Sequence, residues 1–163
     1  TIILLLQSFP SFGNPNVMGI ICESLKKNPT FVPVFGLWLD GKNRVNFFLS
    51  GDIGVHQFFE GRYILKDFSI SMNFPQELSQ QGFGVYSGNF VINRETGQLK
   101  KMGKPETTNW YNKENWFCNK VSLIKNEFLS NLETRTKERE KIEEMEKKKK
   151  QKEYKDRLNK RKF

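Results

Sequence analysis

The sequence predicts an α+β protein in which a small antiparallel β-meander or open barrel precedes a long, charged C-terminal helix. Before Phe128, aromatic and β-branched residues fall into runs separated by turn sequences, which is typical of strands. From about Asn112 onward, the apolar residues recur every three or four positions, which is typical of an amphipathic helix. We expect an extended segment over residues 1–29, a β domain over residues 30–103, and a linker with the helix over residues 104–163.

The β domain is predicted mainly from its turns, which are Asp40-Gly41-Lys42-Asn43, Ser50-Gly51-Asp52 and the stretch 93–97. An Asp-Gly pair between two β-prone runs is a strong hairpin signal. The expected strands cover residues 31–39, 45–50, 63–74, 84–93 and 99–102. Within residues 63–74, alternation places Phe68, Ile70 and Met72 on one face. We expect residues 11–30 to be mostly loop, with a short helix over residues 17–27.

A weak internal repeat runs through this domain, because Gly36, Gly61 and Gly88 each stand two residues before an aromatic side chain. Its best copy, residues 84–93 with Gly97 after them, is similar to a MORN repeat, and this resemblance implies a scaffold of stacked hairpins. The other two copies are partial, so we favour a generic meander or small open barrel. A ligand-binding barrel of the lipocalin type is a further alternative, but it needs eight strands and the sequence shows five or six.

The C-terminal helix begins, in this interpretation, with an apolar face that packs on the β domain. We expect this packing to involve Trp110, Trp116, Phe117, Val121, Ile124 and Phe128. Beyond Leu132 the apolar face fades, and acid-before-base pairs four residues apart, such as Glu143–Lys147, support the helix instead. The spacing does not favour a coiled coil, because Lys149 and Lys152 fall where apolar core residues would be needed.

Enzyme signatures are absent from the sequence. His56 is the only histidine and there is no C-x-x-C motif, so a metal site with two histidines is excluded. Pairing of Cys22 or Cys118 with His56 is arithmetically possible, but no nucleophile motif surrounds either cysteine. We therefore predict no catalytic site, no metal and no cofactor.

The sequence leaves open whether Cys22 and Cys118 form a disulfide, and we favour free cysteines in a reducing, intracellular compartment. A mitochondrial or plastid location, after removal of a leader, is also left open because the chain starts at Thr1. No apolar run is long enough for a transmembrane helix, so we expect membrane contact to be peripheral at most.

The basic tail is the most functional-looking feature of the sequence. The chain has 27 Lys and Arg against 18 Asp and Glu, and residues 133–163 hold 14 of the former and 8 of the latter. The candidate partner or phosphate contacts are Lys147, Lys148, Lys149, Lys150, Arg157, Lys160, Arg161 and Lys162. Because acids are interleaved with these cations, we predict a non-catalytic accessory or scaffold subunit of a large multiprotein assembly. The alternatives are a ribosome-associated, RNA-binding subunit and an anionic lipid surface.

Overall fold

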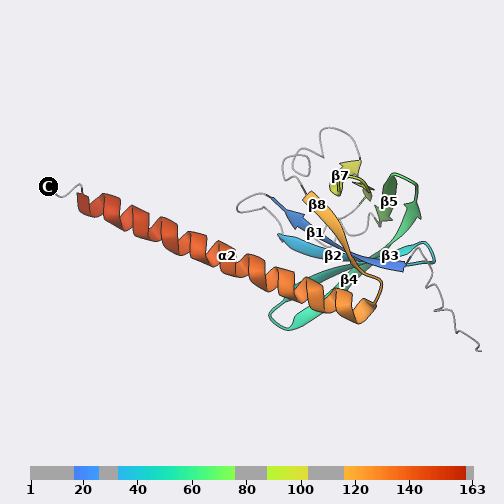
Figure 1. The fold of residues 1–163 in the computed structure, drawn as a ribbon, viewed down its shortest axis with the longest axis horizontal. Helices are drawn as coiled ribbons and strands as arrows, with labels where there is room; N and C mark the ends of the chain where they lie inside the picture. Colours follow the sequence, from blue (N-terminus) through green and yellow to red (C-terminus); the bar gives the residue numbers. More distant parts are fainter. Residues whose placement is uncertain (1–16, 26–32, 76–87, 103–115, 161–163) are drawn as a thin grey trace, which may run out of the picture.

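The computed structural model describes residues 17–25, 33–75, 88–102 and 116–160, and its strands form a closed antiparallel barrel with one long helix across its outside (Figure 1). Each strand pairs with the next in sequence, and β8 pairs with β1. The elements are β1 (Val17–Ser24), β2 (Val34–Asp40), β3 (Arg44–Gly51), β4 (Gly54–Leu65), β5 (Ser69–Phe74), β6 (Gly88–Asn93), β7 (Gln98–Met102), β8 (Trp116–Ser122) and α2 (Lys125–Lys160). The α+β class with a barrel is confirmed, and the barrel is closed rather than open.

The predicted turns join the strands where expected. Between β2 and β3, Asp40 Oδ1 accepts hydrogen bonds from the backbone N–H groups of Lys42 (2.7 Å) and Arg44 (3.1 Å), while Gly41 and Asn43 adopt positive φ. Burial alone would raise the pKa of Asp40, but these N–H groups and the Arg44 guanidinium outweigh burial and hold it below its ordinary value. Between β6 and β7, Asn93 Oδ1 likewise accepts hydrogen bonds from the backbone N–H groups of Glu95 (2.8 Å) and Thr96 (2.9 Å). Local side-chain hydrogen bonds therefore fix both hairpins.

Three sequence predictions about elements are wrong. Residues 17–24 form β1 rather than part of a short helix. The expected strand over residues 63–74 is divided into the end of β4 and all of β5, so Phe68 lies exposed in the turn while Ile70 and Met72 face the barrel interior. The C-terminal helix begins at Lys125 rather than near Asn112, because residues 116–122 complete the barrel as β8.

The barrel interior is filled by apolar side chains from every strand. Alternate residues point inward, which is the arrangement that a closed antiparallel barrel imposes. Phe47 stacks between Phe35 and Phe59, with ring centroids 4.9 and 4.4 Å away. Trp116 from β8 is 1% exposed and lies 5.0 Å from Phe35. This interior is the main core of the protein.

A second apolar cluster lies on the outside of the barrel, beneath the start of α2. It consists of Ile21, Val34, Trp38, Phe48, Phe128 and Leu132, and we call it the outer cluster. Phe128 sits in a notch made by two glycines, since a Cβ on Gly19 would lie 2.5 Å from its Cδ2 and one on Gly36 would lie 2.6 Å from its Cζ. The ring is fully buried and packs against Trp38 and Phe48 at centroid distances of 5.5 and 5.6 Å. The notch thereby seats the first turns of α2 on β1, β2 and β3.

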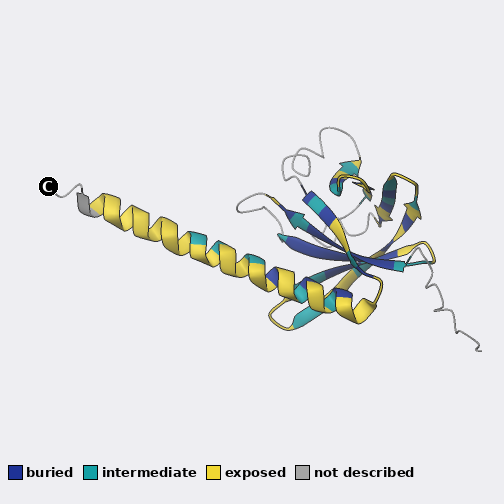
Figure 2. Ribbon diagram, in the orientation of Figure 1, coloured by how far each residue is buried: buried dark blue, intermediate teal, exposed yellow. Residues whose placement is uncertain are grey.

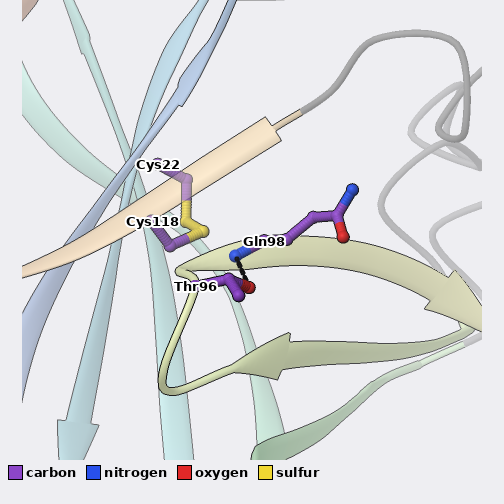
Figure 3. The surroundings of a disulfide bond; sticks show 4 residues. All are labelled: Cys22, Thr96, Gln98 and Cys118. Carbon is purple, nitrogen blue, oxygen red and sulfur yellow. Dashed lines mark hydrogen bonds between the residues drawn. A yellow bond between two sulfur atoms is a disulfide. The ribbon is translucent and has the colours of Figure 1, made fainter.

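A disulfide bond between Cys22 of β1 and Cys118 of β8 joins the first and last strands of the barrel (Figure 3). The two cysteines are register partners in the β1–β8 ladder and both are buried. The structure pairs them, so the expectation of free cysteines is wrong. On its other side, β8 pairs with β7 at Gln98–Phe117 and Leu99–Trp116, and the Cys118 N–H donates to Gly97 O at 2.8 Å. The bond therefore reinforces the strand that closes the barrel.

The first prediction concerns the glycine notch. We expect Phe128→Ala to lower the free energy of unfolding by about 3–5 kcal/mol, the range for removing a buried aromatic ring. Phe68→Ala is the matched control because Phe68 is 68% exposed, and it should change stability by less than about 0.5 kcal/mol. Urea denaturation followed by tryptophan fluorescence measures both variants. Equal midpoints for the two would show that Phe128 is not seated in the notch.

The second prediction concerns the disulfide. Since the bond closes a loop of 96 residues, the chain-entropy model gives a loss of roughly 4–5 kcal/mol on reduction, as it does for loops of about 100 residues. We expect wild-type protein to unfold at lower urea when dithiothreitol is present. The double variant Cys22→Ala/Cys118→Ala should unfold at the same urea concentration with and without reductant. If the wild-type protein unfolded at the same urea concentration with and without dithiothreitol, the result would count against the disulfide bond.

Candidate functional site

Among the described residues, the cavity inside the barrel is too small for a small-molecule ligand. It measures about 10 Å³ and is lined by Phe35, Leu37, Phe47, Met72, Phe74, Phe90 and Leu99. This volume is at the lower limit for one water molecule, whereas ligand pockets are typically about 300–1,000 Å³. Although the barrel has the eight strands of a lipocalin-like protein, its aromatic side chains occupy the space that a ligand would need.

One end of the barrel carries an open hollow of about 240 Å³, whose lining includes Arg94 and Lys120. Arg94 Nη1 donates to the backbone carbonyl oxygens of Lys66 (2.8 Å) and Asp67 (2.9 Å). The guanidinium thus holds the β4–β5 turn in place. This structural role explains the position of Arg94. The residues that line the hollow include no Asp or Glu.

The chain has one histidine, His56, and two cysteines, Cys22 and Cys118. No cluster of three or more His, Cys, Asp or Glu residues in the described part of the chain could hold a metal ion. His56 lies exposed on β4. The sulfur atoms of Cys22 and Cys118 are bonded to each other, so neither is available as a thiolate nucleophile.

The helix α2 is the longest element among the described residues, and most of its residues are exposed. It has 36 residues and, at about 1.5 Å per residue, extends roughly 54 Å. Its first turns are anchored by Phe128, Leu132 and Thr136, all buried. From Lys147 to Leu158 every residue is exposed, and this part projects away from the barrel (Figure 2). We call residues 147–160 the distal segment and residues 133–146 the proximal segment.

Charge is distributed unevenly between these two segments. The proximal segment holds four Lys or Arg and six Asp or Glu, for a net charge of −2. The distal segment holds eight Lys or Arg and two Asp or Glu, for a net charge of +6. Six of the tail's eight acids therefore lie near the barrel, and the projecting part of the helix is strongly cationic.

The proximal acids are engaged in ion pairs along the helix. Arg139 Nε lies 3.0 Å from Glu143 Oε1, and Lys148 Nζ lies 2.7 Å from Glu144 Oε1. The hydrogen bond and positive charge of Lys148 lower the pKa of Glu144. Arg135 also approaches Glu23 of β1 at 3.9 Å. Glu144–Lys148 has the favourable order of acid before base, whereas Arg139–Glu143 has the reverse order, and Arg135 links the helix to the barrel.

The sequence-predicted contact residues lie on the distal segment or outside the described residues. Lys147, Lys148, Lys149, Lys150 and Arg157 are exposed on the distal segment, whose last residue is Lys160. Arg161 and Lys162 lie outside the described residues. The five exposed cations lie on one projecting helix. The four consecutive lysines point in different directions around it because successive residues turn by about 100°.

The residues predicted to pack the helix on the body are also divided. Phe128 and Val121 belong to or pack on the outer cluster, whereas Trp116 lies inside the barrel on β8. Phe117 is half-buried on β8, and Ile124 is 57% exposed just before α2. Trp110 lies outside the described residues. The sequence interpretation placed Leu132 on the apolar face of the helix, but it missed the part that Gly19, Gly36, Trp38 and Phe48 play in this contact.

Comparisons with protein-family profiles, with curated proteins and with solved structures give no match. Residues 88–93, which resembled part of a MORN repeat, form strand β6 of the closed barrel. No helix within the described ranges combines the length and the apolar composition needed to cross a membrane.

Proposed function

We propose that this protein is a non-catalytic accessory subunit of a large assembly, in which the barrel is a rigid platform and α2 is a strut that contacts a neighbour. The observation that carries the proposal is the distal segment, where a helix anchored on the barrel continues for several turns with every described side chain exposed. An isolated helix shorter than about 12–15 residues is only marginally stable in water. Contact with a partner would stabilise the exposed distal segment, which the barrel does not cover with any described side chain.

The filled barrel supports the same proposal. Aromatic packing inside, a disulfide across the closing strands and a helix seated in the glycine notch all favour a rigid body. A rigid platform gives the helix a defined direction, so less orientational freedom is lost when the helix binds.

The third prediction tests whether the helix acts as a strut. We expect the wild-type protein, gently extracted from its source, to sediment with a particle far larger than its own 19.2 kDa. Glu140→Pro should release the protein from this particle, because proline costs about 3 kcal/mol in a helix interior and would separate the distal segment from the anchored turns. Sedimentation with mass spectrometry of the fractions measures the association.

Glu140→Ala is the matched control because Glu140 is exposed and alanine maintains the helix. It should sediment like wild type. Glu140→Ala should retain the wild-type unfolding midpoint. Glu140→Pro should keep the barrel folded, because the proline disturbs the helix back to Thr136 but not at Phe128 and Leu132, which anchor it on the outer cluster. Migration of wild type as a free monomer, or particle association that Glu140→Pro leaves intact, would overturn the proposed function.

A further inference from the structure

We infer that the distal segment of α2 is a docking site for the phosphate backbone of folded RNA. The inference rests on the proposed function, in which this part of the helix contacts the neighbour, and it names the chemistry of that neighbour. It is carried by three properties of the segment, namely its charge density, its choice of cation and the arrangement of the cations around the helix.

The charge density of the segment matches that of a nucleic acid strand. Its 14 residues span about 21 Å, so a net charge of +6 corresponds to roughly one positive charge per 3.5 Å. A strand of duplex nucleic acid carries one phosphate per about 3.4 Å of helix axis. Interaction of a cation with the helix dipole explains at most the last turn, and Lys148 pairs with Glu144, which leaves Lys147, Lys149, Lys150 and Lys152 to be explained.

The cations are almost all lysines, which favours phosphate over an acidic protein surface. Seven of the eight are lysine and only Arg157 is arginine. Protein–protein interfaces are enriched in arginine and depleted in lysine, so a lysine-rich surface is atypical of them. Lysine instead presents a mobile point charge, which suits phosphates whose positions vary.

The arrangement around the helix favours a partner that surrounds it. Lys147, Lys148, Lys149 and Lys150 together cover the full circumference, so no flat surface can contact all four. Folded RNA presents phosphates on several sides of a bound element, and proteins recognise it largely by shape and backbone contacts. The segment has no stripe of arginine, asparagine or glutamine aligned to read base edges in a DNA major groove. Recognition through the backbone of folded RNA is the consistent choice.

The fourth prediction compares the purified wild-type chain with Lys149→Gln/Lys152→Gln/Lys155→Gln. Glutamine has a helix propensity close to that of lysine, so the charge falls from +6 to +3 while the helix is retained. Fluorescence anisotropy with a labelled RNA hairpin measures binding between about 50 and 200 mM salt. If about six phosphates are contacted, the slope of log K against log salt should be near −4, and the triple variant should reduce it to about −2. We expect RNA binding by the variant to be at least about tenfold weaker at the lower salt.

The matched control is Lys42→Gln/Lys66→Gln/Lys100→Gln, which removes the same charge from exposed positions on the barrel. It should bind the hairpin with the wild-type salt slope. Circular dichroism confirms that both triple variants keep the helix content of wild type. Equal losses in the two variants would show a general charge effect and would overturn the assignment to the distal segment.

Two further probes decide the class of partner. A labelled polyglutamate peptide represents an acidic protein surface, and a DNA duplex of equal charge represents the other nucleic acid. Tighter binding to the hairpin than to either probe supports the inference, and equal or tighter binding to polyglutamate or DNA overturns it. Because this experiment uses purified protein, its failure is distinguishable from failure of the particle experiment, which tests association without reference to RNA.

Discussion

The seating of Phe128 on Gly19 and Gly36 is the contact on which the position of α2 depends. The two glycines lie on neighbouring strands, and any side chain at either would occupy the space of the ring. The contact buries an aromatic side chain completely outside the main core, and Trp38 and Phe48 enclose it from the sides. Since the rest of α2 continues as one helix from these turns, the notch also sets where the distal segment points.

The barrel in turn supplies the surface that the notch requires. Strands β1 and β2 carry apolar residues on both faces, with Ile20 and Leu37 inside and Ile21 and Trp38 outside. Such strands are stable only when both faces are covered, and the interior and α2 cover one face each. The disulfide adds to this arrangement because it fixes β1 to β8, the strand that leads directly into the helix. Closure of the barrel and docking of the helix are therefore coupled through the same two strands.

The strands that the sequence predicts well are those whose information is local. The hairpins at Asp40 and Asn93 follow from side chains that hydrogen-bond their own turns, and they do not depend on distant residues. β1 was missed because its residues are buried on both faces and show no polar alternation. β8 was mistaken for helix because Phe117, Val121 and Phe128 are spaced as on one helical face, although the first two residues belong to β8. The glycine notch depends on residues about a hundred positions apart, and a single sequence gives no signal for such a contact.

The sequence showed which charged residues the candidate site contains, but not how the structure divides them along the helix. The tail's cations are visible in the sequence, and its interleaved acids suggest that much of the charge is neutralised. The structure changes this interpretation because it divides the helix at the end of its docked part. Acids concentrate in the proximal segment, where Arg135 approaches Glu23 of the barrel and Arg139 pairs with Glu143. There they support helix turns that have few apolar contacts. From Lys147 to Leu158 every residue is exposed, and there the cations outnumber the acids. Charge is thus separated along the helix, with ion pairs in the proximal segment and an excess of cations in the exposed distal segment.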